Sequence, residues 1–394
     1  MKKVCFFMAT PFSLGGEQRV VTVISNLLVE DGYDVTIACT DISIPRSVNP
    51  YNLDNRVKIK YINGYNNKYV TKIRDLRWKL YYNNLYNARY KNDLFMQKFI
   101  NCDLITQILL IRFFNKGKYD YVISLSTIYN TMLAGVSKKI KAKTIGWQHN
   151  QSKIYFSTEG KRHYNQDKFT KYMFKKLDSY VVLTEYDKKY LKEKYNVDVI
   201  CINNPKSIVS NKVTNLKNKQ FLSVGRFDKI KNHLTLIDMF NEFHKQNKEW
   251  KLVILGDGEL KEEYIKKIKS YNLEKFIIIE NYTNDVEKYY LNSSICVMPS
   301  LYEGYSMVMT EAMEYGLPII CFDMPCAHEM IENNKSGYIV KCYDEKEFTN
   351  KMITLANNNE LLKEFSINTK NISNKKTYKS VVDKWIELFK NLKN

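Results

Sequence analysis

The segment 295–316 carries the residue types and the spacing needed to hold a phosphate group. An apolar run at its start predicts a buried strand, a loop with proline and glycine follows, and helical spacing of apolar residues then predicts a helix. The first N–H groups of such a helix have no helical partners, so they are suited to bind an anion. These are the N–H groups near Ser306, Met307 and Val308.

Two carboxylates belong to the same segment. Glu303 lies in the loop and Glu311 lies well inside the helix, with seven residues between them. Both are expected at the carboxyl end of the strand, where open α/β sheets bind ligands. The alternative is a loop charge and a solvated helix residue, because charged side chains are mostly exposed.

The pair of glutamates resembles the E-x7-E signature of retaining glycosyltransferases with the GT-B fold, family 4, also called glycosyl transferases group 1. The similarity extends through the run Glu-Ala-Met-Glu-Tyr-Gly-Leu-Pro-Ile-Ile at 311–320. The resemblance implies that Glu303 hydrogen-bonds and orients a donor sugar. It also implies that Glu311 accepts hydrogen bonds from ribose hydroxyls of the nucleotide.

Two cations share a second predicted strand-to-helix loop. Arg226 and Lys231 lie five residues apart after Gly225. Cleavage of a sugar–phosphate bond leaves negative charge on the departing oxygen, and fixed cations can stabilise that charge. Family 4 enzymes carry an arginine and a lysine at this spacing, so the resemblance implies that both stabilise the departing nucleotide diphosphate. The alternative is two exposed bases in a basic protein.

Two glycines follow the first predicted strand and precede a helix at 17–30. Gly15 and Gly16 would let backbone come close to a ligand, although a plain turn is the alternative. The G-x-G-x-x-G pattern of a dinucleotide fold is absent here. The run at 15–20 is similar to the G-G-A-E-R-V run of family 4. It departs at Glu17 and Gln18, so only the two glycines carry over.

Two further side chains are expected near the donor. His149 follows a predicted strand at 143–147, and a lone histidine there is often a satisfied polar residue. The resemblance implies that His149 contacts the donor sugar. Tyr282, after a strand at 276–280, is expected to stack near the base. The run at 323–329 departs from the Gly-Pro-Arg-Glu pattern of relatives, which leaves the donor sugar open.

Neither a metal nor a cofactor is expected, and a UDP-sugar would serve as donor substrate. No D-x-D motif lies at a strand end, so the two cations would replace a metal ion. The eight cysteines are scattered without the spacing of a zinc site. They are expected to be small core residues in a reducing compartment.

Positive charge is concentrated in the first half of the chain. The net charge is +19, and residues 1–200 hold 33 Lys and Arg against 17 Asp and Glu. Between 68 and 98 basic residues alternate with aromatic ones, which suits an anionic membrane interface or equally a single-stranded nucleic acid. The alternative is a surface helix whose aromatic residues pack inward. Because no apolar run reaches 18 residues, we expect a cytoplasmic protein peripherally associated with the inner face of the cell membrane.

Alternating strand and helix patterns in both halves predict an α/β fold with two doubly wound, Rossmann-like parallel sheets facing a central cleft. We assign 1–203 to an acceptor-binding domain, 204–219 to a linker and 220–376 to a nucleotide-sugar-binding domain. The resemblance implies that a C-terminal helix, 377–394, crosses back onto the first domain.

The activity predicted from the resemblance is retaining transfer of a hexose or N-acetylhexosamine from a UDP-sugar in surface polysaccharide biosynthesis, for example of lipopolysaccharide or capsule. The acceptor is expected to be a saccharide linked to an isoprenoid diphosphate, and nucleic acid is not expected as a partner. One alternative is a UDP-sugar epimerase of the same fold. The other is a non-enzymatic protein that binds nucleic acid through its basic and aromatic helices.

Overall fold

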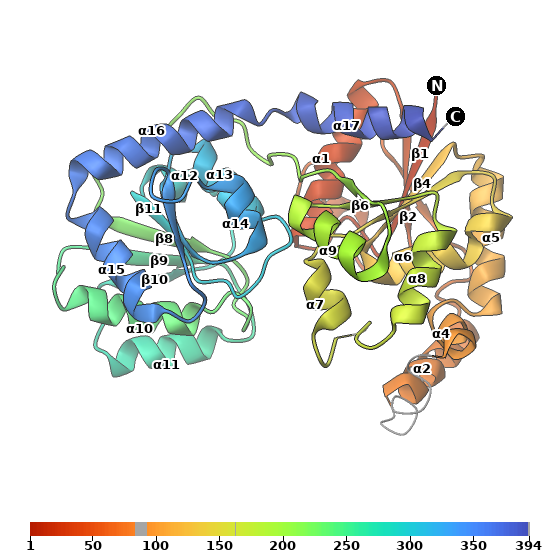
Figure 1. The fold of residues 1–394 in the computed structure, drawn as a ribbon, viewed down its shortest axis with the longest axis horizontal. Coiled ribbons are helices and arrows are strands. Elements are labelled where there is room, and N and C mark those ends of the chain that lie inside the picture. Colours follow the sequence, from red (N-terminus) through yellow and green to blue (C-terminus); the bar gives the residue numbers. More distant parts are fainter. Residues whose placement is uncertain (83–92, 162, 393–394) are drawn as a thin grey trace. The chain divides into compact units, whose positions relative to one another are not determined.

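The computed structural model describes residues 1–82, 93–161 and 163–392, and the chain forms two compact units (Figure 1). The first unit consists of Met1–Pro205 together with Tyr378–Asn394, and the second of Lys206–Thr377. Each unit is a parallel sheet with helices on both faces. This arrangement buries both faces of every central strand, which explains why the strands are continuous apolar runs without polar alternation.

The first unit contains a seven-stranded sheet in the order β3-β2-β1-β4-β5-β6-β7. Its strands are β1 (Lys3–Met8), β2 (Asp34–Cys39), β3 (Lys58–Tyr61), β4 (Tyr121–Leu125), β5 (Lys143–Trp147), β6 (Ser179–Val182) and β7 (Ile200–Cys201). Its helices are α1 (Gly16–Glu30), α2 (Lys68–Tyr82), α4 (Leu94–Asn101), α5 (Leu104–Gly117), α6 (Ser126–Val136), α7 (Ser152–Ser157), α8 (Asp167–Lys176), α9 (Glu185–Tyr195) and α17 (Tyr378–Asn391), with short 3-10 helices η1 (Arg46–Val48) and η2 (Ser137–Lys139).

The second unit contains a six-stranded sheet in the order β10-β9-β8-β11-β12-β13. Its strands are β8 (Gln220–Val224), β9 (Lys251–Leu255), β10 (Ile277–Glu280), β11 (Ile295–Met298), β12 (Ile319–Phe322) and β13 (Gly337–Val340). Its helices are α10 (His233–His244), α11 (Lys261–Ser270), α12 (Glu287–Leu291), α13 (Met307–Glu314), α14 (Pro325–Met330), α15 (Glu345–Ala356) and α16 (Asn359–Lys375).

In both sheets the strand order reverses beside the first strand of the unit. The chain runs outward from β1 to β3 on one side and then returns to place β4 on the other side of β1. In the second unit β8 and β11 have the same relation. Loops after two such strands diverge to opposite faces of the sheet, which leaves room for a ligand at their carboxyl ends.

The last helix, α17, belongs to the first unit, as the sequence predicts. Its apolar side chains recur at helical spacing, and Trp385 and Phe389 are almost fully buried. The Trp385 ring meets the ring of Trp147 on β5 edge-on, with centroids 4.8 Å apart. The hydroxyl of Tyr121 on β4 donates a 2.8 Å hydrogen bond to the carbonyl of Phe389. The chain end is therefore attached to the central strands of this sheet.

The segment predicted as a linker, 204–219, is mostly part of the second unit. Residues from Lys206 onward are held by hydrogen bonds to that unit. The hydroxyl of Thr214 donates to the carbonyl of Ser293, and its N–H donates to the carbonyl of Tyr315. Asn, Lys and Ser content suggested a free connection, but Lys206 and Ser207 bind the buried carboxylates of Glu314 and Glu311.

Most predicted strands match the structure to within one or two residues, and larger differences lie at edges. The strand predicted at 143–147 is β5, and the strand predicted at 276–280 matches β10 to within one residue. The edge strand β13 was not predicted, since Gly337 and Tyr338 do not form a recognisable apolar run.

The basic and aromatic stretch 68–98 is only partly described. Its helices α2 and α4 flank residues 83–92, which lie outside the described residues. No single helix in 1–82, 93–161 or 163–392 is long and apolar enough to cross a membrane. The pair α4 and α5, bent by 59°, satisfies the same criteria of length and composition when taken together.

We expect Trp385→Ala to destabilise the first unit by about 3–5 kcal/mol, because it removes a large buried ring and leaves a cavity beside Trp147. Urea denaturation followed by circular dichroism would measure this loss. The exposed neighbour Lys384 provides the control, since Lys384→Ala should change the unfolding free energy by less than about 0.5 kcal/mol. Equal effects of the two changes would contradict the assigned packing of α17.

Candidate active site

Two loops meet at the carboxyl ends of β8 and β11, where the second sheet reverses its strand order. The first loop, 225–232, leads from β8 into α10, and the second, 299–306, leads from β11 into α13. The N–H of Leu301 donates a 2.9 Å hydrogen bond to the carbonyl of Ile230, which joins the two loops. The sequence places the predicted cations in one of these loops and Glu303 in the other.

Lys231 and Glu303 form an ion pair across these loops. The Lys231 Nζ lies 2.5 Å from Glu303 Oε1, and the two side chains are only 17% and 15% exposed. Asp228 fixes the backbone at Lys231, because its Oδ1 accepts hydrogen bonds from the N–H groups of Ile230 and Lys231. Gly225 leaves room for the lysine, since a Cβ there would lie 3.1 Å from its Cδ and Cε.

Arg226 is not part of this pair. Its side chain is 74% exposed, and its Nη2 lies 3.3 Å from Asp228 Oδ2. An exposed ion pair of this length contributes little to stability, so the guanidinium can leave Asp228 at small cost. The structure therefore brings Lys231 and Glu303 together and places Arg226 at the surface of the same loop.

The start of α13 presents backbone N–H groups beside the Lys231–Glu303 pair. Ser306 is the N-cap, and its hydroxyl accepts a hydrogen bond from the N–H of Met309. The N–H groups of Met307 and Val308 are in the first turn and have no carbonyl one turn earlier to bind. The positive end of the helix dipole lies at the same place, so this end of α13 favours an anion.

Glu311 is buried, so the alternative of a solvated helix residue is wrong. The residue is 2% exposed. Its Oε1 accepts a 2.7 Å hydrogen bond from the hydroxyl of Ser207, and its Oε2 accepts one of 2.8 Å from Tyr290. Each carboxylate oxygen can accept a second hydrogen bond. The predicted contact of Glu311 with ribose hydroxyls stays a prediction.

Glu314 is a second buried carboxylate in the same helix, and it was not assigned a role from the sequence. Lys206 Nζ lies 2.6 Å from its Oε2, and Lys370 Nζ lies 3.0 Å from its Oε1. The Ser373 hydroxyl and the N–H of Ser210 also donate to it. Burial would raise the pKa of Glu314, but the hydrogen bonds from these groups lower it to about 2. The i, i+3 spacing of Glu311 and Glu314 was the available signal.

The loop before α13 is also fixed by Lys376, which lies near the C-terminal end of the second unit. Lys376 Nζ donates hydrogen bonds to the hydroxyl of Tyr305, at 2.9 Å, and to the carbonyl of Glu329, at 3.1 Å. Tyr305 is 5% exposed. The segment from 303 to 314 is therefore bonded to residues at both ends of the second unit.

His149 and the two glycines belong to the first unit. The ring of His149 packs on Trp147, with centroids 4.3 Å apart. Its buried Nε2 has no hydrogen-bond partner among the described residues. Burial lowers the pKa of His149 to about 3, so the ring is neutral at physiological pH. A neutral ring with an unpaired nitrogen is suited to hydrogen-bond a sugar hydroxyl.

At the start of α1, the N–H of Gly15 donates to the hydroxyl of Tyr51, and Gly16 has open space where a side chain would lie. Gly16 is exposed, so no packing contact requires glycine there. Glu17, in the next position, was set aside as a departure from the family pattern. Burial raises the pKa of Glu17 to about 7, so this carboxyl changes charge near neutral pH.

Tyr282 is not brought to the other predicted residues by the sheet. It follows β10, which is separated from β8 by β9. The side chain is 41% exposed, and its hydroxyl donates to Asn284. Stacking of Tyr282 on a base stays a prediction.

Known proteins resemble both the second unit and the chain as a whole. Residues 206–372, nearly the whole second unit, match the family model described as glycosyl transferases group 1. An uncharacterized glycosyltransferase from Haemophilus influenzae is 28% identical over 98% of this chain and 99% of its own length. The second unit therefore resembles the group 1 glycosyltransferases, and the chain is a glycosyltransferase.

Two further relatives of this glycosyltransferase have named activities. The amylovoran biosynthesis glycosyltransferase AmsD of Erwinia amylovora is 27% identical over 89% of each chain. A Campylobacter jejuni protein is 32% identical over 38% of this chain and 40% of its own. It is named N-acetylgalactosamine-N,N'-diacetylbacillosaminyl-diphospho-undecaprenol 4-alpha-N-acetylgalactosaminyltransferase.

Solved structures confirm the predicted fold class. A mutant of Staphylococcus aureus TarM, in complex with fondaparinux, alpha-GlcNAc-glycerol and UDP, matches with a TM-score of 0.76. The two share 17% identity, and the match covers 99% of this chain and 100% of that one. The glycosyltransferase therefore has the GT-B fold, with two doubly wound parallel sheets and a last helix that returns to the first unit.

We expect Glu314→Gln to destabilise the second unit by about 3 kcal/mol at neutral pH, because it leaves Lys206 and Lys370 without their buried carboxylate. The pKa of Glu314 lies below its ordinary value of 4.5, so its charge stabilises the folded state above that pH. The stabilisation is lost as the pH falls toward 2.

The difference in unfolding free energy between wild type and Glu314→Gln should therefore shrink between about pH 5 and pH 2. Denaturant titrations at several pH values measure it. Glu274 is exposed in the same unit, so Glu274→Gln is the matched control and should leave the stability unchanged. A difference that is constant with pH would rule out the assigned ion pairs.

Proposed function

We propose that this glycosyltransferase moves a hexose or N-acetylhexosamine from a UDP-sugar to a saccharide acceptor with retention of anomeric configuration. The observation that carries the proposal is the Lys231–Glu303 pair next to the start of α13. This places a cation, a carboxylate and free N–H groups at the switch point of one sheet. UDP, bound in the TarM structure, supports the choice of nucleotide.

The chemistry follows from the charges. The bond between the anomeric carbon and the diphosphate oxygen breaks, and the leaving oxygen becomes negative. Lys231, Arg226 and the first N–H groups of α13 would stabilise this oxygen, which is usually the largest catalytic contribution. The acceptor hydroxyl would attack from the face that the diphosphate leaves, and its proton would pass to the departing phosphate.

Glu303 would orient the sugar. Without substrate its carboxylate is paired with Lys231, so the pair holds both side chains in place before the donor arrives. The diphosphate would compete for the lysine, and the carboxylate would then accept hydrogen bonds from sugar hydroxyls. His149 would contact the donor sugar as a neutral ring. Fixed cations in this role make a metal ion unnecessary, so we propose a metal-independent reaction without cofactor.

The acceptor is proposed to be a saccharide linked to an isoprenoid diphosphate, in surface polysaccharide biosynthesis. The names of the Erwinia and Campylobacter relatives support this choice, since one acts in amylovoran biosynthesis and the other on a diphospho-undecaprenol saccharide. A lipid-linked acceptor requires the enzyme to work at a membrane surface. We therefore propose peripheral association with the inner face of the cell membrane, and no role for nucleic acid.

Purified protein incubated with a panel of UDP- and GDP-sugars tests the proposal directly. Release of UDP with transfer to a diphosphate-linked saccharide, and an unchanged anomeric configuration in the product, is the expected result. Interconversion of the UDP-sugar without an acceptor would indicate the epimerase. Inversion at the anomeric carbon would refute the retaining mechanism.

Glu303→Gln should lower kcat at least about 100-fold, because the neutral amide neither pairs with Lys231 nor orients the sugar in the same way. Steady-state kinetics with the preferred donor measure the effect, and circular dichroism verifies the fold. Glu345→Gln, an exposed glutamate of the same unit, should retain wild-type kcat. Wild-type turnover by Glu303→Gln would exclude the role assigned to Glu303.

Arg226→Ala and Lys231→Ala should each lower kcat, and together by about three orders of magnitude, because both cations stabilise the leaving diphosphate. Lys229 lies in the same loop and is exposed, so Lys229→Ala is the matched control. Kinetics of the three single changes and the double change separate the contributions. Unchanged kcat in the double variant would overturn leaving-group stabilisation by this loop.

A further inference from the structure

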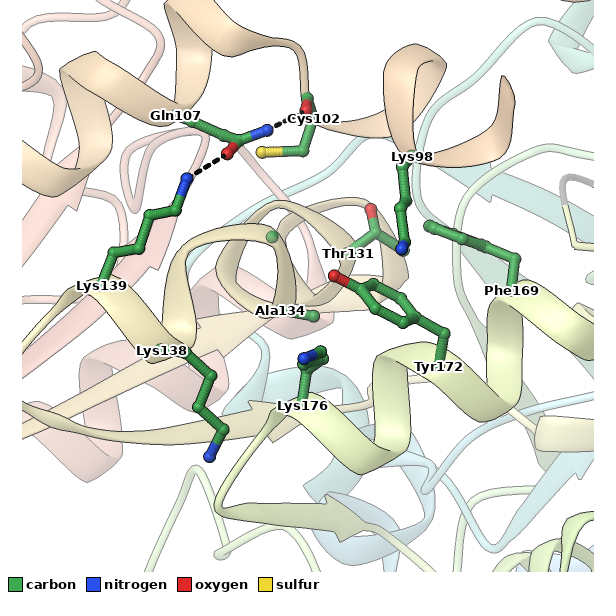
Figure 2. Close-up of a pocket in the computed structure, with 11 residues that line it drawn as sticks. Lys98, Cys102, Gln107, Thr131, Ala134, Lys138, Lys139, Phe169, Tyr172 and Lys176 are labelled. Atoms are coloured by element: carbon green, nitrogen blue, oxygen red, sulfur yellow. Dashed lines mark hydrogen bonds between the residues drawn. The ribbon is translucent and has the colours of Figure 1, made fainter. Parts of the chain in front are cut away.

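A basic pocket lies in the first unit, away from the residues assigned to the donor. It has a volume of about 260 Å³ and is formed by α4, α5, α6, η2 and α8 (Figure 2). Four lysines from three different elements, α4, η2 and α8, line it. They are Lys98, Lys138, Lys139 and Lys176. None of the described residues that line the pocket is acidic, so its interior is electropositive.

Two of these lysines approach one aromatic ring. The Lys98 Nζ lies 4.1 Å from the ring centroid of Tyr172, and the Lys176 Nζ lies 5.5 Å from it. Figure 2 shows the two side chains reaching toward Tyr172 from α4 and α8. The cation–π contacts hold both ammonium groups at a fixed position. Two like charges on one ring repel each other, and a bound anion would relieve that repulsion.

The other two lysines, Lys138 and Lys139, belong to η2. Lys139 Nζ donates a 3.3 Å hydrogen bond to Gln107 Oε1, which leaves its remaining protons available. Lys138 Nζ lies 3.9 Å from Asp178, so its charge is partly balanced outside the pocket. Burial raises the pKa of Tyr172, so its hydroxyl keeps its proton and can donate to an oxygen anion. The pocket thus offers several donors to a single multivalent anion.

The helices next to the pocket carry exposed apolar side chains. On α4, Phe95 is 75% exposed and Phe99, one turn later, is 46% exposed. On α5, Leu104 is 71% exposed and Ile108, again one turn later, is 53% exposed. Apolar residues at this spacing form a stripe along each helix. An apolar stripe next to lysines is the arrangement with which interfacial helices bind anionic membranes.

We propose that the lysine pocket binds the phosphate headgroup of an anionic membrane lipid while the apolar stripes of α4 and α5 enter the bilayer interface. The occupant is a lipid because a soluble phosphate ester would use the lysines but not the exposed Phe95 and Leu104. The assignment rests on the proposed membrane association and gives it a defined site.

Vesicle co-sedimentation of the full chain tests this site. Wild-type protein should bind phosphatidylcholine vesicles that contain phosphatidylglycerol, and should bind pure phosphatidylcholine weakly. Lys98→Gln with Lys176→Gln should weaken binding to the anionic vesicles about 10- to 30-fold. The control pair Lys188→Gln with Lys189→Gln removes equal charge from exposed positions on α9, and should change binding less than about threefold. Equal loss of binding in both double variants would refute binding in the pocket and indicate diffuse electrostatic attraction to the vesicle surface.

A second pair tests the apolar stripes. Phe95→Ser with Leu104→Ser should weaken vesicle binding but leave binding of inorganic pyrophosphate, measured by calorimetry, unchanged. If the pocket lysine variant lost pyrophosphate binding and kept vesicle binding, the ligand would be soluble and the lipid assignment would be overturned. Hydrolysis of UDP-sugar without vesicles should be the same in all these variants. Absence of transfer from every UDP-sugar to the diphosphate-linked saccharide in wild type would refute the proposed function without affecting the vesicle result.

Discussion

The ion pair between Lys231 and Glu303 is the interaction on which the candidate site depends. It joins the loops after β8 and β11, which a parallel sheet of this strand order would otherwise direct to opposite faces. The pair is mostly shielded from water, so its two charges interact more strongly than an exposed pair would. In the proposed reaction, the phosphates of the donor would pair with the lysine and the sugar hydroxyls would bind the carboxylate. The ion pair would thereby hold both side chains in place for the two halves of the proposed donor.

Helix α13, which follows the loop of Glu303, is held in place by two buried carboxylates. Glu311 and Glu314 face the protein interior and accept hydrogen bonds from groups far apart in the chain. A buried carboxylate without such partners would be very costly, and with them it holds the helix in one orientation. The N–H groups of Met307 and Val308 are consequently aimed in a fixed direction. Electrostatic catalysis needs such donors to be in place before charge develops.

The architecture was readable from the sequence because parallel strands buried on both faces are nearly continuous apolar runs, as at Ile295–Met298. The positions of Glu303 and Lys231 at one edge of the sheet were readable because each lies in a loop that follows such a strand. Burial of Glu311 and Glu314 could not be predicted from the sequence. Their partners Ser207 and Lys206 lie over 100 residues earlier, in a polar stretch that looks like a linker. The basic pocket could not be predicted either, because Lys98 and Lys176 are far apart in the sequence and only the fold brings both to the ring of Tyr172.

The second unit begins at Lys206 and ends at Thr377, and residues at both borders are hydrogen-bonded to the segment 303–314. Lys206 and Ser207 bind its two buried glutamates, and Lys376 binds Tyr305 two residues after Glu303. The two ends of this unit are therefore hydrogen-bonded to the loop that carries Glu303 and to α13. A change in backbone position at either end of the unit would consequently reach Tyr305, Glu311 and Glu314 through single hydrogen bonds.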